Sequence, residues 1–132
     1  MTVESAMRML KLSRSAFYRA FPAAENAARG VVSTQDVTDF LNGCAVNIAN
    51  TLRYPVPLLD EQDVAPLLQV DGHPATDNQV RRFCRRRLFP IPHYRFSKSV
   101  VRFPRGAVEW WQDPKTRKKP VGSRSFNVAE VM

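Results

Sequence analysis

The sequence predicts a mainly α-helical fold with a small β-hairpin wing, a winged helix-turn-helix. Residues 76–88 carry a narrow apolar stripe opposite an Arg/Asn side, which is typical of a short amphipathic helix. Two β-prone runs, 94–96 and 100–103, then flank a short polar turn. The net charge of +8 is also uneven, because residues 81–124 hold fourteen basic and two acidic side chains. Such a concentration of charge indicates a polyanion-binding protein.

Residues 1–53 are expected to form an N-terminal helical domain that resembles a helix-turn-helix. Thr2 is a candidate cap for a first helix, and Ser13 for a second helix that Pro22 terminates. The outer side of the second helix is a possible second DNA-binding surface, with Arg14, Ser15, Tyr18 and Arg19. An ordinary amphipathic helix whose arginines are merely solvated explains the same pattern equally well.

Residues 33–52 show the cleanest helical periodicity in the chain. The apolar positions are Val37, Phe40, Leu41, Cys44, Ala45, Ile48 and Leu52. They predict one helix of about 18 residues, capped by Ser33 or Thr34 and weakened by Gly43. Its stripe serves either as domain core or as a self-association surface. Residues 22–32 show no clear paired strands, so this half would lack a wing. The order of helices parallels the second half, which indicates two tandem degenerate copies.

A linker is expected at 54–57, where Pro55 and Pro57 break helical structure. The second domain, 58–112, then begins with a helix from Asp60 or Glu61. Its inward residues are predicted to be Val64, Leu67 and Leu68, and Pro66 either kinks the helix or delays its start. Residues 71–74 read as a turn.

The central helix begins after Thr76, which with Gln79 fits the reciprocal capping pattern. It must end by Phe89, because two prolines follow within three residues. Its apolar side holds Val80, Phe83 and Cys84. Its predicted DNA-binding side holds Asn78, Arg81, Arg82, Arg85 and Arg86. Arginine pairs bidentately with guanine, and asparagine with adenine, in the major groove.

The hairpin around residues 97–99 is expected to lie on the adjacent DNA backbone or minor groove. Its predicted contacts are Arg95, Ser97, Lys98 and Arg102. A solvated charged face is the simpler explanation for an arginine run taken alone. The capped helix, the hairpin and the basic tail together favour DNA binding.

After the hairpin, residues 107–111 predict a short helix, with Val108 and Trp111 closing the core against Phe83 and Phe103. Residues 113–132 are then expected to be a basic, disordered tail. Its candidate DNA contacts are Lys115, Arg117, Lys118 and Lys119.

Residues 58–119 resemble the excisionases of temperate phages and integrative elements, within the broader MerR-like winged helix-turn-helix class. The resemblance is carried by 80–83 (Val-Arg-Arg-Phe), 88–92 (Leu-Phe-Pro-Ile-Pro), 101–103 (Val-Arg-Phe) and 107–108 (Ala-Val). It implies a non-enzymatic recombination directionality factor. Such a protein would bind repeated sites beside an attachment site, self-associate on double-stranded DNA, bend it, and help a tyrosine- or serine-type integrase excise.

Two other functions stay open. One is a small winged-helix transcription regulator of a phage or mobile element, since fold does not fix function. The other is a protein-interaction adaptor similar to a terminase small subunit, which the periodic stretch 33–52 would favour.

Several classes of function are not expected. No nucleophile–base pair or Gly-rich phosphate loop is visible, so we expect no enzyme and no cofactor. The spacing of Cys44, Cys84, His73 and His93 does not suit zinc. No signal-peptide pattern or apolar run long enough to span a membrane occurs. We therefore expect no membrane partner, and a place in the bacterial cytoplasm in association with the nucleoid.

Overall fold

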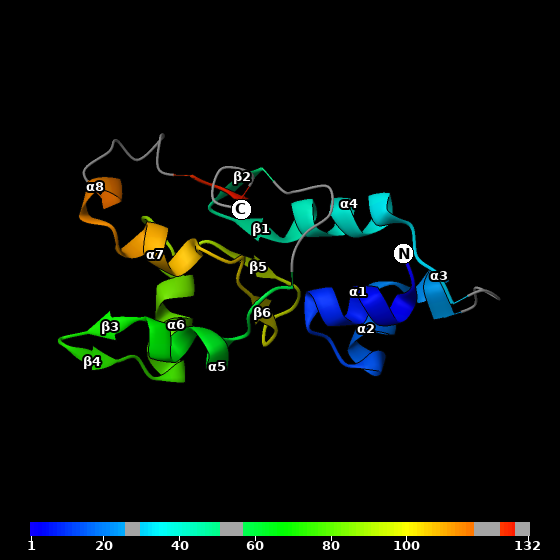
Figure 1. Ribbon diagram of the computed structural model, residues 1–132, viewed down its shortest axis with the longest axis horizontal. Coiled ribbons are helices and arrows are strands. Elements are labelled where there is room, and N and C mark those ends of the chain that lie inside the picture. Colours follow the sequence, from blue (N-terminus) through cyan, green and yellow to red (C-terminus); the bar gives the residue numbers. More distant parts are fainter. Residues whose placement is uncertain (26–29, 51–56, 118–124, 129–132) are drawn as a thin grey trace.

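Two groups of helices lie at opposite ends of an elongated molecule, with a small sheet between them (Figure 1). The structure is a computed structural model, and it describes residues 1–25, 30–50, 57–117 and 125–128. In this part of the chain, helices combine with three small sheets, of order β1-β5-β6, β2-β7 and β3-β4. The fold is therefore mixed, and its strands are more numerous than the sequence indicates.

The first group of helices begins with α1 (Val3–Leu10), α2 (Arg14–Ala20) and α3 (Pro22–Glu25). The predicted caps are confirmed: Thr2 Oγ1 accepts a hydrogen bond from the Ser5 amide at 3.1 Å, and Ser13 Oγ accepts one from the Ala16 amide at 3.3 Å. Phe17 is fully buried at the centre of this group's core. The two capped helices thus form a helix pair joined by a tight turn.

Helix α4 (Thr34–Cys44) is shorter than predicted, although Ser33 caps it as expected. The chain continues instead as β1 (Ala45–Val46) and β2 (Ile48–Asn50). The prediction of one helix to residue 52 was wrong because β1 finds a strand partner far along the chain. Ala45 and Ile48 still pack against the first core. The apolar periodicity therefore indicated correctly that these residues face the core, although they are not helical. Leu52 lies outside the described residues.

The second group of elements begins with α5 (Glu61–Val64) and the 3-10 turn η1 (Ala65–Leu67), followed by the hairpin β3 (Gln69–Val70) and β4 (His73–Pro74). Asp60 caps α5 reciprocally with Asp63. Val64 and Leu68 are buried as predicted, but Leu67 is 53% exposed. Pro66 lies in η1, whose tighter winding turns Leu67 outward.

The next elements are α6 (Asp77–Cys84), β5 (His93–Arg95), β6 (Val101–Arg102) and α7 (Ala107–Gln112). The predicted hairpin and the helix after it are both present. Trp111, Val108 and Phe103 are buried in one core with Val80 and Cys84, and Phe83 packs against it. This core fixes the inner face of α6 and leaves its other face outward.

The C-terminal segment departs from the expected disordered tail. Residues Pro114–Arg117 form the short helix α8, and β7 (Phe126–Asn127) pairs in parallel with β2. The side chain of Phe126 is fully buried, with its ring centroid 5.5 Å from that of Trp110. The tail lacks helical periodicity, and this burial depends on contacts with distant segments, which a periodicity argument does not detect.

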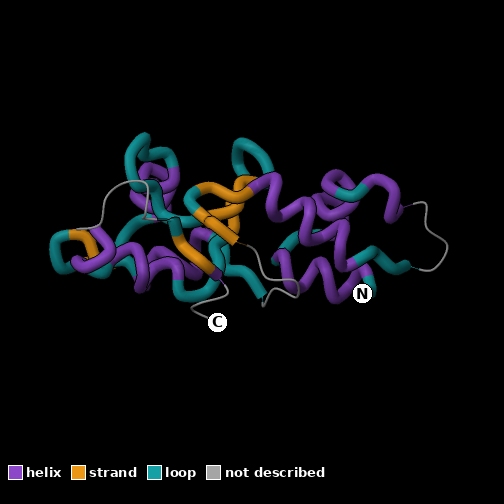
Figure 2. Tube along the Cα trace, turned by 90° about the horizontal axis from the view of Figure 1, so that it is seen from above, coloured by secondary structure: helices purple, strands orange, loops and turns teal. Residues whose placement is uncertain are grey.

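One sheet crosses the boundary that we expected at residues 54–57. Strand β5 lies between β1 from the first half and β6, with Ala45 opposite Tyr94 and Arg102 on the other side of Tyr94. Most strands gather in the middle of the molecule, between the two groups of helices (orange in Figure 2). Residues 54–56 of the expected linker lie outside the described residues. The hairpin of the second half is thereby held between both groups of helices.

Candidate nucleic-acid interface

Helix α6 presents the polar face that the sequence predicts. Thr76 and Gln79 cap it reciprocally, with amide-to-side-chain distances of 2.9 and 3.2 Å. Val80 and Cys84 are buried on the inner side. The exposed residues include Asn78, Arg81, Arg82 and Arg85. The capping residues and the apolar stripe of α6 are thus sufficient to explain why these four side chains face outward.

Arg81 is held by a neighbouring helix, which the sequence did not suggest. Its Nε donates to Glu61 Oε2 of α5 at 2.8 Å, while 54% of the Arg81 side chain stays exposed and only 14% of Glu61 does. The pair braces α5 against α6. A carboxylate at this place also reduces the positive charge that Arg81 adds to the surface.

Arg86 does not belong to the helix. Helix α6 ends at Cys84, and Arg85 is its C-cap. The chain then turns, with Phe89 at φ 51° and the Ile91 amide donating to the Phe83 carbonyl at 3.2 Å. The Arg86 guanidinium lies 5.7 Å from the centroid of the Trp111 ring. The prediction that Arg86 lies on the same helix as Arg81 and Arg82 was therefore wrong.

The β5–β6 hairpin, which the sequence predicts to be a wing, has an exposed tip. The Phe96 and Ser97 amides both donate to the Val100 carbonyl, at 2.9 and 3.2 Å, which closes the hairpin. Ser97, Lys98 and Ser99 are exposed beyond this closure. The predicted tip contacts Ser97 and Lys98 are thus available to a partner.

A cleft of about 200 Å³ lies between α6 and the β5–β6 hairpin. Its charged lining consists of Arg81 and Arg85 from α6, Arg95 and Lys98 from the hairpin, and Glu61 from α5. Four cations facing one anion suit an anionic ligand such as a phosphate backbone. Cys84 also lines the cleft, but burial raises the pKa of its thiol to about 12, so it stays protonated and unreactive.

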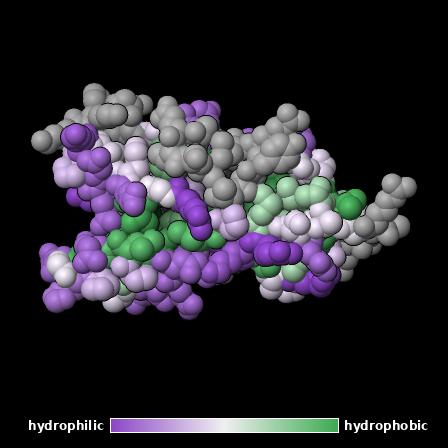
Figure 3. Space-filling view, viewed as in Figure 1, coloured by the Kyte–Doolittle hydropathy of each residue, from purple (hydrophilic) through white to green (hydrophobic). Residues whose placement is uncertain are grey.

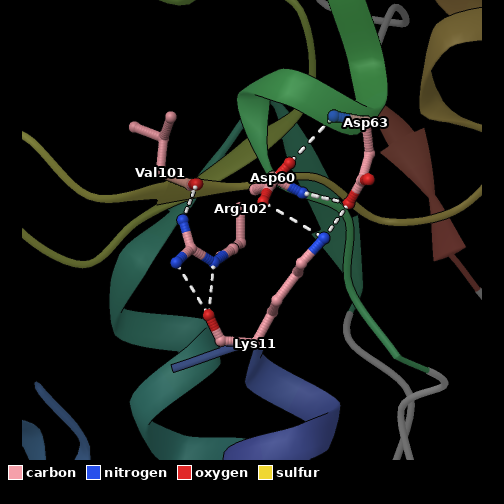
Figure 4. A network of polar contacts seen from close by, with 5 residues as sticks. All are labelled: Lys11, Asp60, Asp63, Val101 and Arg102. Atoms are coloured by element: carbon pink, nitrogen blue, oxygen red, sulfur yellow. Dashed lines mark hydrogen bonds and ion pairs between the residues drawn. The ribbon is translucent and has the colours of Figure 1, made fainter. Parts of the chain in front are cut away.

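Arg102, predicted to contact DNA from the hairpin, is half-buried and forms hydrogen bonds within the molecule (Figure 4). Its Nε and Nη2 donate to the Lys11 carbonyl at 3.0 and 2.7 Å, and its Nη1 donates to the Val101 carbonyl at 2.7 Å. Burial lowers the pKa of Arg102, and the nearby carboxylates of Asp60 and Glu61 oppose that shift. The Arg102 side chain therefore links the second half of the chain to the first through hydrogen bonds.

Lys11 completes the same junction. Its ammonium group hydrogen-bonds Asp63 and lies 3.1 Å from Asp60 Oδ2. These bonds raise the pKa of Lys11, and the Lys11 bond is the main cause that lowers the pKa of Asp63 (Figure 4). The turn between α1 and α2 is thus tied to the start of α5.

Helix α2 carries the other candidate DNA-binding residues. Arg14, Ser15 and Arg19 are exposed, as expected for the outer side. Tyr18 is half-buried, and its ring meets that of Phe17 edge-on at a centroid distance of 5.8 Å. Tyr18 therefore belongs partly to the core. The hydrophilic band along the lower edge of Figure 3 reaches from α5 and α6 to α1 and α2.

The candidate contacts of the tail separate into two kinds. Lys115 is exposed, and its amide donates to Asp113 Oδ1 at 2.9 Å. The Arg117 guanidinium lies 5.2 Å from the centroid of the Trp111 ring, which secures α8 to the core. Lys118 and Lys119 lie outside the described residues.

The sequence did not identify Lys11 or Glu61 as parts of this region. Their partners lie 52 and 20 positions away, respectively, so no local spacing signals the contacts. Among the described residues, no group of His, Cys, Asp and Glu is placed to hold a metal ion. In the same ranges, no helix combines the length and apolarity that crossing a membrane requires.

Comparison with known proteins finds no matching family model, no matching curated protein and no matching solved structure.

Proposed function

We propose that this chain is a non-enzymatic protein that binds double-stranded DNA through a winged helix-turn-helix formed by α5 to α7. Helix α6 is the recognition helix, and the β5–β6 hairpin is the wing. The observation that carries the proposal is the basic cleft between them. There, Arg85 from the helix and Lys98 from the hairpin line one concave surface.

The order of elements supports this assignment. Helix α6 follows α5, η1 and the short β3–β4 hairpin, the β5–β6 hairpin follows α6, and α7 packs into the core that α6 and β6 share. Leu59, just before α5, pairs with Phe103 at the end of the wing through amide–carbonyl bonds of 2.9 and 2.8 Å. This pairing holds the wing in a fixed position beside the helices, and a fixed position is what docking into adjacent grooves requires.

The roles of the residues follow from chemistry. Asn78, Arg82 and Arg85 enter the major groove, where a good bidentate Arg–guanine pair is worth about 1–3 kcal/mol of discrimination. Lys98 and Ser97 contact the phosphate backbone and add affinity without sequence preference. If about five or six phosphates are neutralised in all, the logarithm of affinity falls against the logarithm of salt with a slope of roughly −5.

For the biological role, we propose an excisionase that acts beside an attachment site in a bacterial cell, together with an integrase. This part rests on the sequence resemblance of residues 58–119. A single small recognition unit has a modest footprint, so tight binding would use several copies on repeated sites. The bend would then come from the array.

Footprinting tests the role. The protein is added at two salt concentrations to the attachment region of the host element and, as a control, to a random duplex of equal length. Protection of regularly spaced repeats beside the recombination core is the expected result. Protection confined to a promoter would instead support a transcription regulator.

Uniform, salt-labile binding without protected repeats would contradict sequence recognition by α6. An adaptor or terminase small-subunit-like protein would give that result together with a tight stoichiometric protein complex. The exposed apolar side chain of Leu67, next to Leu59 at the edge of an open groove, is the observation that favours such a protein contact.

A further inference from the structure

The wing contacts both groups of helices. On one side, Arg95, Lys98 and Val101 line the cleft against α6. On the other, Phe96 and Val100 pack against the first core, and the Phe96 ring centroid lies 5.1 Å from that of Phe40 in α4. One hairpin therefore stands between two helical units, and its exposed tip belongs to both surfaces.

A second cleft, of about 330 Å³, lies on that other side of the wing. Arg19 is the one charged residue of its lining, and Ser97 at the hairpin tip adds a hydroxyl group. The rest of the lining is apolar: Leu12, Ala16, Ala20, Phe40, Phe96 and Val100. Helix α2 thus lies beside the hairpin tip as α6 does, with Arg19 exposed and the small side chains of Ala16 and Ala20 partly exposed. Small side chains at this place leave room for a phosphate backbone to approach.

The junction keeps this geometry fixed. Lys11, which directly precedes the turn into α2, accepts two hydrogen bonds from Arg102 of the wing and pairs with Asp60 and Asp63. Strand β1 adds backbone pairing to β5 on the same side. Helix α2 and the wing therefore form a rigid pair of surfaces.

We propose that α2 is a second DNA-contacting helix that shares the wing with α6, so that one protomer holds one duplex at two places. Resting on the proposed function, the inference adds Arg14 and Arg19 to the interface. Both side chains are exposed on α2. Asp36 and Asp39 line the next hollow beyond Ala20 and Phe40, which limits the DNA path on this side.

The test compares charge-matched variants of the full chain. R14Q/R19Q removes two positive charges from α2, and R82Q/R85Q removes two from α6. The control R8Q/R105Q removes two exposed arginines, which line hollows next to α1 and α7. Affinity for a fluorescein-labelled mixed-sequence duplex of about two helical turns is measured by anisotropy over a range of salt concentrations.

If Arg14 and Arg19 each neutralise one phosphate, R14Q/R19Q lowers the magnitude of the log–log salt slope by about 1.8, whereas R8Q/R105Q leaves it unchanged. R14K/R19K, which keeps both charges, retains the wild-type slope. Shortening the duplex to about one turn weakens the wild type and leaves R14Q/R19Q little changed. Urea unfolding of each variant confirms that the exposed substitutions leave the fold intact.

A slope for R14Q/R19Q equal to that of R8Q/R105Q, while R82Q/R85Q shows a reduced slope, would overturn the second contact and leave the proposed function standing. If the salt slope of R82Q/R85Q also equalled that of R8Q/R105Q, both the second contact and the proposed function would be contradicted.

Discussion

The guanidinium of Arg102 donates two hydrogen bonds to the main-chain carbonyl of Lys11, from Nε at 3.0 Å and from Nη2 at 2.7 Å. The two residues are 91 positions apart. The bonds tie the wing of the second half to the α1–α2 turn of the first half. An arginine that the sequence assigns to DNA therefore holds the molecule together.

Replacing Arg102 with Met should destabilise the whole chain by about 2 kcal/mol, because the variant cannot form these two charge-assisted hydrogen bonds. Urea unfolding measures the change, with Arg105→Met as the control, since Arg105 is exposed. Arg102→Lys keeps the charge but lacks the planar fork, so it should be nearly as unstable as Arg102→Met. A stable Arg102→Lys protein would contradict the stabilising role of the two bonds to the Lys11 carbonyl.

His93 makes stability depend on pH. The ring is fully buried, and its Nδ1–H donates to the Ile91 carbonyl at 2.7 Å, while Nε2 is buried without a hydrogen-bond partner among the described residues. Burial lowers the pKa of His93. The unfolded chain therefore binds the proton more readily, so this contribution is complete above about pH 6.5 and declines as pH falls toward the folded pKa.

As pH falls, the free energy of unfolding should decrease by at most about 1.4 kcal/mol per pH unit, the limit for one titrating group. Unfolding free energies are compared between about pH 7.5 and pH 5 for the wild type, His93→Gln and His73→Gln. His93→Gln should flatten the profile, whereas His73→Gln, at an exposed hairpin position, should retain it. Parallel profiles for the wild type and His93→Gln would contradict this account.

The C-terminal strand should contribute to stability. Phe126 is fully buried beside Trp110, Ile48 and Ala107. Phe126→Ala should cost about 3–5 kcal/mol, the usual range for a buried phenylalanine. Leu88, which is 69% exposed, provides the control, and Leu88→Ala should change stability by less than about 0.5 kcal/mol. Equal stability of both variants would mean that β7 contributes nothing to the fold.

Features that depend on nearby residues could be predicted from the sequence. The caps Ser13, Ser33 and Thr76, the buried stripe of α6 and the wing hairpin all follow from residues within a few positions of one another. Here the local preference and the final structure agree, which is typical of foldable sequences.

Features that depend on distant partners could not be predicted. The apolar period continues through Ala45 and Ile48, yet these residues form strands because β5 and β7 pair with them. Tertiary pairing overrides helical propensity here. The contacts of Arg102 and Arg86 could not be predicted for the same reason, since the Lys11 carbonyl and the Trp111 ring are far away in sequence.

The most direct test of the central claim compares R82Q/K98Q with R8Q/R105Q for binding to double-stranded DNA. Both variants lack two positive charges of the wild type, but only R82Q/K98Q changes α6 and the wing tip. Because R82Q/K98Q lacks one proposed base contact and one proposed phosphate contact, we expect its affinity for DNA to be at least about tenfold weaker than that of the wild type. R8Q/R105Q should stay near the wild type. Equal affinities of the two variants would contradict a DNA interface formed by α6 and the wing.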